Sequence, residues 1–491
     1  MSEKENTYKK IIRSTSLFGL VQLSNLIISA LRHKFFAVII GPAGYGTLSL
    51  LYSSFDIIRQ VSGLGLDVAG VKKISENNNN PVAKYKTAAL IIKLSVITGG
   101  LGTLLFIAAS YNLSKWIFGN TSQVLILLLI SIAVLFRQVI AGQTAVMQGE
   151  GKLRYLAKTN LLGNLFGLFL TLPLFIFFKT AAILPSILVS AVVTLAVSCF
   201  YYNKMEMQKY NVSYNVAFKE GKDILYFGGL IAINGFLPVV ANYIIQLYIN
   251  AISGLAEVGL YNTGQVIIIS YMGIVFSAMT MEYYPRLASY NKDGIKEGNA
   301  VSQQVIISIL LIIPVILAFL GFMPLIIKIL FSAKFLSVIP MLSWLVIAMF
   351  FKAVSFCMGY VIIARADSSV FLKTSIVFNA LYIGLCIGGY YFGGLEGLGI
   401  AYLIYYVIHL ISIYLIVKFR YGLIYDAKLY KLFMLGLLNM FILVGIIKFT
   451  DGIIKYAVLL ILFIIFGVLF IKEASKHFNI KEFIAKKIKK V

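Results

Sequence analysis

Acidic residues are scarce in this sequence, in which 19 Asp and Glu stand against 43 Lys and Arg among 491 residues. Charged residues of both signs make up only 13% of the chain, whereas 60% of it is hydrophobic. A soluble protein of this length could not bury so much apolar surface, so the composition predicts an all-α polytopic membrane protein. The net charge of +24 does not indicate nucleic-acid binding, because no soluble domain or arm is present to carry it.

Cysteine and histidine are also rare. The three cysteines lie inside apolar runs, and the three histidines are scattered, with no HExxH or CxxC spacing. We therefore expect no disulfide, no metal site and no cofactor. The segment from Met1 to Arg13 is polar and charged, and no small-residue cleavage site follows the first apolar run. A cleavable signal peptide is not expected.

Apolar runs of about 20 residues, the length that spans a bilayer, recur along the whole chain. The gaps between them are at most about 25 residues long, which leaves no room for a soluble catalytic domain. Fourteen transmembrane helices are predicted, at residues 15–38, 44–66, 87–110, 122–146, 157–178, 181–202, 224–250, 257–282, 300–325, 336–363, 370–392, 396–418, 429–449 and 453–472.

Basic residues are distributed unevenly between the two sides that these helices define. The side that holds both termini and the connections after even-numbered helices carries 31 Lys and Arg, the opposite side carries six, and six lie within helices. Because cytoplasmic loops carry the excess of Lys and Arg, both termini are predicted to be cytoplasmic.

The chain also repeats itself. Gly41–Gly46 matches Gly254–Gly259 at a sequence offset of 213, and Lys158, Thr159 and Asn164 match residues 373, 374 and 379 at an offset of 215. This offset equals six helices plus a linker, so two pseudo-symmetric six-helix lobes are predicted as parallel repeats. The expected divisions are an N-lobe at 1–202, a cytoplasmic linker at 203–223, a C-lobe at 224–418, and two last helices with a basic tail at 419–491.

Polar residues follow one face of each of the first two predicted helices. Gln22, Asn25, Ser29 and Arg32 recur at steps of three or four residues, and the second helix has a matching stripe at 49, 53, 56, 60, 63 and 67. At about 100° per residue, such a set falls on one narrow face of a helix. Polar residues in a membrane normally face a polar cavity, so we expect both helices to line one.

Several blocks of sequence carry a family resemblance: Gly41–Gly46, Gly63–Leu66, Val71–Lys73, Tyr284–Leu287 and Leu330–Phe335, with Trp344, Lys352 and Gly359–Ala364. In these blocks and in its six plus six plus two helices, the chain resembles the multidrug/oligosaccharidyl-lipid/polysaccharide exporter superfamily, and within it the Wzx-type flippases. The resemblance implies a V-shaped architecture like that of the MATE transporters, with alternating access. It implies a cargo of an undecaprenyl-pyrophosphate-linked oligosaccharide such as an O-antigen repeat unit, which moves from the cytoplasmic to the periplasmic leaflet of the bacterial inner membrane. A polysaccharide polymerase machinery would be a partner.

A pyrophosphate in a hydrocarbon slab needs cations to replace its lost hydration, and Arg binds phosphate bidentately. The intramembrane cations expected to bind phosphate or anionic sugar are Arg32, Arg59, Arg137, Lys352, Lys34 and Lys93. Two of them, Lys34 and Lys93, lie near helix ends and could equally extend to a membrane interface.

Asp56 is the principal carboxylate within the predicted helices. It either pairs with Arg59 one turn away or serves as a proton or sodium coupling site, and the two alternatives stay open. Amides suited to sugar hydroxyls are Gln22, Asn25, Asn160, Asn164, Asn234, Asn242 and Gln246, although amides also pack helices together.

The excess of intramembrane cations favours an anionic cargo over the cationic drugs of a MATE-type antiporter with the same fold, which is the alternative. A membrane-embedded glycosyltransferase or polymerase would need paired carboxylates or a nucleophile with its base, and neither set is evident, so the protein is not expected to be an enzyme. The seventh and eighth predicted helices repeat the glycine turn but carry amides in place of Arg32, Asp56 and Arg59. The first lobe is therefore expected to hold the phosphate.

Overall fold

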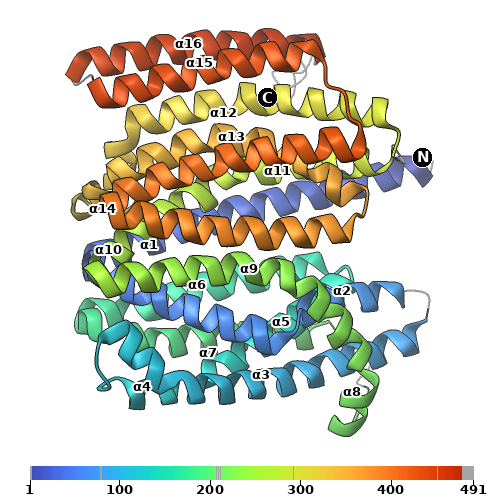
Figure 1. The fold of residues 1–491 in the computed structure, drawn as a ribbon. Helices are drawn as coiled ribbons and strands as arrows, with labels where there is room; N and C mark the ends of the chain where they lie inside the picture. The colour runs from blue at the N-terminus through green and yellow to red at the C-terminus, as the bar shows by residue number, and fades with distance from the viewer. Residues whose placement is uncertain are drawn as a thin grey trace, which may run out of the picture. The chain divides into compact units, whose positions relative to one another are not determined.

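The computed structural model describes residues 3–77, 80–205, 207, 210, 212–290, 292–449 and 452–477. All regular elements in this part of the chain are helices, and long helices lie side by side (Figure 1). In chain order they are α1 (Glu3–Gly63), α2 (Leu66–Glu76), α3 (Pro81–Phe118), α4 (Val124–Ile130), α5 (Ile132–Gly149), α6 (Leu153–Phe178), η1 (Lys179–Ala182), α7 (Ile183–Asn203), α8 (Tyr214–Glu220), α9 (Lys222–Ser253), α10 (Leu255–Val266), the π-helix η2 (Ile267–Met272), α11 (Gly273–Ala288), α12 (Gly294–Leu330), η3 (Ala333–Val338), α13 (Ile339–Ala364), α14 (Ser368–Tyr421), α15 (Ala427–Phe449) and α16 (Gly452–His477).

Nine helical stretches in the described part of the chain are long and apolar enough to cross a membrane. Three of them are much longer than one span requires, at 40, 51 and 54 residues. The protein is therefore an all-helical, multi-pass membrane protein, as its composition predicts.

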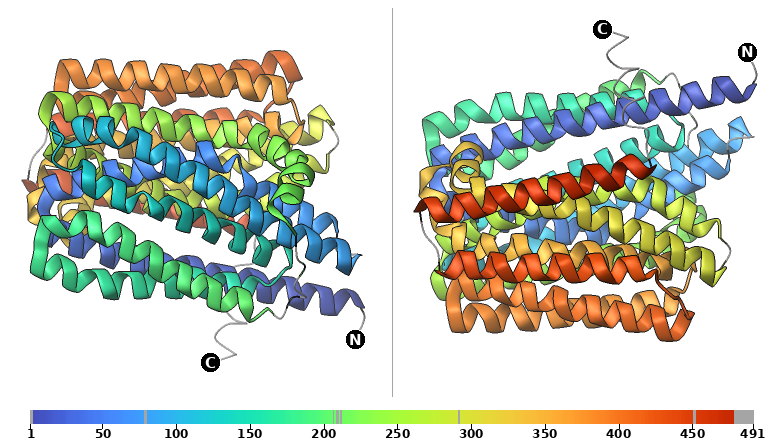
Figure 2. Two further views of the ribbon diagram at one scale, coloured as in Figure 1. Left: turned by 90° about the horizontal axis from the view of Figure 1, so that it is seen from below. Right: turned by 90° about the horizontal axis from the view of Figure 1, so that it is seen from above.

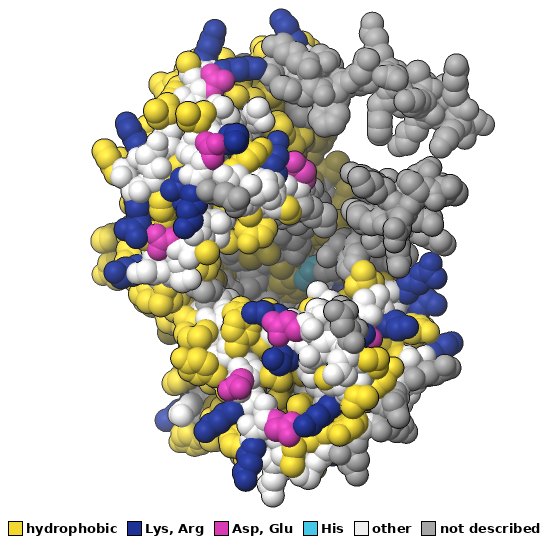
Figure 3. Space-filling model, turned by 90° about the vertical axis from the view of Figure 1, so that its right-hand side faces the viewer, with side chains coloured by type: hydrophobic (Ala, Val, Ile, Leu, Met, Phe, Trp, Pro, Cys, Tyr) yellow, Lys and Arg dark blue, Asp and Glu magenta, His cyan; other side chains and the backbone are white. Residues whose placement is uncertain are grey.

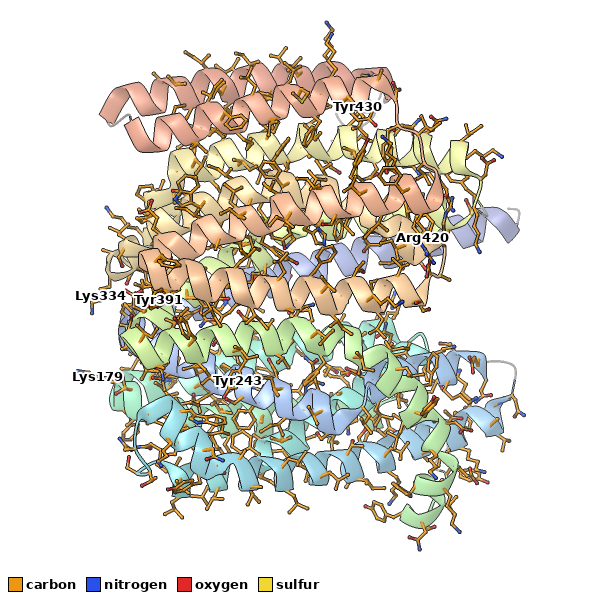
Figure 4. All side chains as sticks on the ribbon, in the orientation of Figure 1. Lys179, Tyr243, Lys334, Tyr391, Arg420 and Tyr430 are labelled. Atoms are coloured by element: carbon orange, nitrogen blue, oxygen red, sulfur yellow. The ribbon has the colours of Figure 1, made fainter. Side chains whose placement is uncertain are left out.

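The longest helices are broken near their middles. The backbone of α1 is non-helical at Gly41, where φ is +65° and Pro42 follows. The backbone of α14 is non-helical at Gly393 and Gly394. The break divides α14 into two helical segments. In Figure 4, Tyr391 lies at the end of these segments where the break is, and Arg420 lies at the opposite end. Both breaks fall between spans that the sequence predicts as separate. Glycine stands at each break because it tolerates a positive φ without strain.

The chain divides into two compact units. Unit 1 comprises Met1–Asn262 and Ile329–Lys334, and unit 2 comprises Thr263–Lys328 and Phe335–Val491. Within unit 1, α3 packs along α5 and α6 along α7 (Figure 2), and α9 packs against α1 and α2. The units follow packing rather than the predicted sequence repeat, so the lobes at 1–202 and 224–418 stay a prediction.

Two glycine turns pack directly on each other in unit 1. A Cβ on Gly46 would lie 2.9 Å from the amide nitrogen of Gly259, and a Cβ on Gly259 would lie 3.1 Å from the amide nitrogen of Gly46. These are the two turns that the sequence repeat pairs with each other. Glycine is needed at both positions because the two backbones approach too closely for any side chain.

Unit 2 is built around α13, which packs along α14. The interior face of α13 carries fully buried side chains such as Leu345 and Phe350. The π-helix η2 connects α10 to α11, and Phe276 on α11 contacts Phe356 on α13 with ring centroids 5.3 Å apart. Tyr283 donates a hydrogen bond of 2.8 Å to the carbonyl of Cys357. These contacts fix α11 against α13.

The predicted linker at 203–223 contains a short helix that sequence reading left out. Ser213 caps α8 by accepting a hydrogen bond from the amide of Val216. Hydroxyl side chains at this position satisfy an orphan N–H of the first helical turn.

Candidate functional site

Unit 1 contains an open cavity of about 430 Å³, and most of its lining residues are polar. Helix α1 contributes Arg32 from before its break and three residues from after it. Helices α5, α6 and α7 supply the rest. The lining residues are Arg32, Tyr52, Asp56, Arg59, Arg137, Ile140, Ala141, Asn164, Ser190, Ala191 and Thr194. We call this space the cationic cavity, because three guanidinium groups and one carboxylate line it.

Two ion pairs involve cavity residues, and neither is the pair expected from local spacing. Arg137 Nη1 lies 3.6 Å from Asp56 Oδ1, and Arg59 Nη1 lies 3.8 Å from Asp67 Oδ2. Asp56 on α1 is thus paired with Arg137 on α5 rather than with Arg59 one turn away on its own helix. The carboxylates are nearly half exposed, at 47% for Asp56 and 45% for Asp67, so both pairs face a polar space.

Aromatic rings position the guanidinium of Arg137. Its Cζ lies 4.9 Å from the centre of the Tyr52 ring and 5.5 Å from that of Phe55. Phe55 in turn stacks on Phe106 of α3, with ring centroids 4.4 Å apart. The ring faces attract the cation electrostatically, so they help to hold the Arg137 guanidinium beside Asp56.

Arg32 lines a second, narrow pocket beside the cationic cavity. Asn164 and Ser190 border both spaces, and Thr171 borders the narrow one. Asn164 Nδ2 lies 3.5 Å from Asn25 Oδ1, so the amides of α1 and α6 meet here. Arg32 is therefore surrounded by hydrogen-bonding groups rather than by apolar side chains alone.

A further cavity of about 340 Å³ shares Arg59 with the cationic cavity. Gln60, Asp67 and Gln138 contribute its polar groups. Gln138 is only 2% exposed, and its Oε1 has no hydrogen-bond partner among the described residues. Arg59 thus stands between a space rich in guanidinium groups and a space rich in amides.

The largest described cavity, about 710 Å³, lies elsewhere in unit 1, between the ends of α3 and α9. Its only charged lining residue is Lys115, and the side chain of Asn250 already donates to the carbonyl of Trp116 at 2.7 Å. Its size would make this cavity the first candidate for a binding site. The three arginines of the cationic cavity make that cavity the better candidate for binding an anion.

The other three predicted cations do not line the cationic cavity. The Lys93 ammonium lies 4.1 Å from the centre of the Tyr214 ring on α8. The Lys352 ammonium in unit 2 lies 5.5 Å from the Phe276 ring centre and 5.4 Å from that of Tyr406. Lys34 is half-buried on α1, outside the lining set.

The predicted sugar-binding amides divide in the same way. Asn25 and Asn164 lie at or beside the cationic cavity, whereas Asn160 is exposed. Gln246 donates a hydrogen bond of 3.1 Å to Ser53, and Asn242 accepts one of 2.7 Å from Tyr261, so these two hold helices together. The side chains of Gln22 and Asn234 lie outside the described residues.

The sequence did not predict three of the polar lining residues: Tyr52, Ser190 and Thr194. Tyr52 precedes Asp56 by four residues and Arg59 by seven, so helical spacing could have placed it on their face. Ser190 and Thr194 are one turn apart on α7, but small hydroxyl residues are common in membrane helices and give little signal alone.

The model of a family described as "Polysaccharide biosynthesis protein" matches residues 35–340, more than half of the chain. The chain belongs to this family. The family match assigns the chain to the polysaccharide biosynthesis proteins. A relative from Shigella flexneri, named for a proposed role in O-antigen transport, is 22% identical over 349 residues, which are 69% of this chain and 81% of the relative.

Two groups of solved structures have the same fold. The lipid II flippase MurJ, in an inward closed conformation, matches with a TM-score of 0.68 at 14% identity, over 95% of this chain and 99% of that one. An inward-facing MATE family multidrug transporter of the MOP superfamily matches with a TM-score of 0.67 at 17% identity, over 84% of this chain and 99% of that one. The chain therefore has the fold that MATE proteins and MurJ share.

Proposed function

We propose that this protein is a transporter, namely a flippase that moves an undecaprenyl-pyrophosphate-linked oligosaccharide repeat unit from the cytoplasmic to the periplasmic leaflet of a bacterial inner membrane. The observation that carries the proposal is the cationic cavity, in which three arginines face one carboxylate. A pyrophosphate that leaves the headgroup region loses hydration, and guanidinium groups in a cavity offset that loss.

The layout of the cavity supports an anionic lipid with sugars attached. In the proposal, Arg32, Arg59 and Arg137 bind the pyrophosphate, and the amides of Asn25 and Asn164 bind the first sugar. The exposed carboxylate of Asp56 holds Arg137 until the cargo arrives.

The transport cycle in this proposal is alternating access by two six-helix lobes within fourteen spans. Its support is the breaks in α1 and α14, the connection of α6 to α7 through η1, and the additional helices α10–α11 and α16. The face in Figure 3, at which α1 begins, shows more Lys and Arg than Asp and Glu side chains, which supports a cytoplasmic assignment for that end.

A MATE-type drug or cation antiporter is the second candidate, favoured by the similarity in fold to a multidrug transporter. A carrier of cationic drugs needs carboxylates in its cavity, and the cationic cavity has two more cations than carboxylates. The charge balance therefore favours the flippase.

The test is deletion of the protein in its native host, followed by extraction of lipid-linked intermediates. We expect an undecaprenyl-linked repeat unit to accumulate and a plasmid copy to clear it. Arg32→Ala, Arg59→Ala and Arg137→Ala should each fail to clear it at unchanged membrane abundance, whereas Lys115→Ala, in the largest cavity, should clear it. An unchanged lipid pool, with drug sensitivity raised instead, would favour the antiporter.

A further inference from the structure

A largely buried ion pair joins the beginning of α3 to the end of α5. Lys84 Nζ lies 2.7 Å from Glu150 Oε2, and the side chains are 17% and 8% exposed. Lys84 is in the first turn of α3, and Glu150 is the residue that caps the C-terminus of α5. The pair therefore ties together two helix ends that are distant in the sequence, on the side predicted to be cytoplasmic.

Unit 2 contains a second buried ion pair, between the beginning of α12 and the end of α13. Arg365 Nε lies 2.9 Å from Glu297 Oε2, and Arg365 Nη2 contacts the same oxygen. The side chains are 14% and 2% exposed. Glu297 is in the first turn of α12, and Arg365 caps the C-terminus of α13. The Tyr421 ring lies 4.8 Å from the Arg365 guanidinium and covers it.

The two pairs occupy equivalent places in the sequence repeat with their charges exchanged. Glu297 follows Lys84 at an offset of 213, and Arg365 follows Glu150 at an offset of 215, which are the two offsets that the repeated motifs define. Lys84, at the beginning of its helix in the first repeat, corresponds to Glu297 in the second. Glu150, at the end of its helix in the first repeat, corresponds to Arg365 in the second. The sign has changed at both members of the pair, so the attraction is kept.

The backbone around the capping residues supports this equivalence. Gly151 and Ala366, which follow them, both have positive φ, at 68° and 54°. The next amides, of Lys152 and Asp367, donate to the carbonyls of Met147 and Ile362, at 2.9 and 3.2 Å. The turn is thus the same in both units although its charges differ.

We propose that these pairs are positioning devices that keep the two helix ends of each repeat together throughout the transport cycle. Separation would leave the carboxylate of Glu150 or Glu297, which is at most 8% exposed, without its partner, and an unpaired buried charge is costly. The helix ends therefore move as one piece, and the movement that opens and closes the transporter takes place at other joints. Because only opposite sign is needed, each pair should function with its charges exchanged. This inference rests on the transport function.

Charge exchange is the first test, with clearance of the lipid-linked intermediate as the readout. Glu150→Lys alone should reduce clearance at least about tenfold, because two buried cations repel, and adding Lys84→Glu should restore it to within about twofold of the unchanged protein. Glu297→Arg alone and with Arg365→Glu should behave in the same way. The matched control is Glu220→Lys, which breaks the exposed pair between Glu220 on α8 and Lys86 on α3 and should have no effect. Doubles that clear no better than singles, or singles that clear normally, would overturn the proposal.

A crosslink tests the joint movement even if the single reversals fail to fold. Cys199, Cys357 and Cys386 are first replaced by Ala in a variant shown to clear the intermediate, and Lys84→Cys and Glu150→Cys are then added. A short bifunctional thiol reagent should join the two ends, and the crosslinked protein should still clear the intermediate. Loss of clearance on crosslinking would mean that the ends separate during transport. Failure of the unchanged protein to clear any lipid would instead contradict the proposed cargo.

Discussion

Gly46 and Gly259, which are far apart in the sequence, each fill the space in which a side chain of the other would lie. The contact is reciprocal, since each glycine also approaches a carbonyl of the other turn, that of Leu255 or of Pro42. Close backbone contact of this kind is a main source of helix association in membranes, where apolar burial contributes little.

Alanine at either glycine should therefore force the turns apart. We expect Gly46→Ala and Gly259→Ala each to destabilise the protein by about 1–3 kcal/mol, the usual range for overpacking. Thermal unfolding of the purified protein in detergent measures the effect. Gly100→Ala is the control, because nothing lies within 4 Å of a Cβ at that position. Unchanged melting of the Gly46 and Gly259 variants would show that the turns can separate at no cost.

The ion pair of Asp56 with Arg137 should matter for transport and not for stability. Both side chains are partly exposed, so the pair contributes less than about 1 kcal/mol. Asp56→Asn and Arg137→Ala should melt within a degree or two of the unchanged protein. Only Arg137→Ala removes a cation that the proposed cargo needs, so it alone should lose clearance of the lipid-linked intermediate. Equal loss in Asp56→Asn would point to a coupling role for the carboxylate.

The hydrogen bonds between Ser53 and Gln246 should stabilise the packing of α1 against α9. Gln246 is fully buried, and its neighbour Tyr243 (Figure 4) accepts a hydrogen bond of 2.9 Å from Ser54 on the same helix surface. A double-mutant cycle with Ser53→Ala and Gln246→Leu should give a coupling energy of about 0.6 kcal/mol, the average for such bonds in membranes. A coupling energy of zero, together with reduced clearance in Gln246→Leu, would instead assign Gln246 to the cargo.

Asp367, between α13 and α14, should make stability depend on pH. The hydrogen bond from the Val370 amide and then the Arg420 guanidinium hold the pKa of this carboxyl below its ordinary value of 3.8. A carboxyl with a lowered pKa contributes stability that is present above the unfolded value and is lost as the pH falls through the folded value. At pH values below about 3.8, the melting temperature of the protein should therefore decrease, and protonation of Asp367 should account for part of the decrease. Asp367→Asn keeps the helix cap but not the charge, so its own fall should be shallower.

Local sequence patterns predicted the helices well and the pairing of charges poorly. The break at Gly41 and the polar face that includes Arg32 and Asn25 follow from residue types and spacing within one helix. The partner of Asp56 does not, because Arg137 belongs to a different helix and comes close only when α5 packs against α1. Sequence spacing indicates only which residues are close on the same helix. The partner in an ion pair also depends on which other helices pack nearby.

The amides show the same limit from the opposite direction. Gln246 and Asn164 look alike in sequence, since each is an amide in a largely apolar helix with a second amide four residues before it. One is fully buried against Ser53, and the other faces the cationic cavity. Which amide packs against a helix and which faces a cavity depends on the neighbouring helix, and no pattern within the amide's own helix carries that information.

The π-helix η2 sets which side of α11 meets α13. A π-turn accommodates one residue more than an α-turn, and one residue corresponds to about 100° of rotation about the helix axis. Removal of a single residue from Ile267–Met272 would let α10 run regularly into α11 and would turn the whole of α11 by about that angle. Phe276 would then leave the ring of Phe356. The π-turn therefore rotates α11 about its axis relative to α10. As a result, the face of α11 that meets its neighbours is not the continuation of the face of α10.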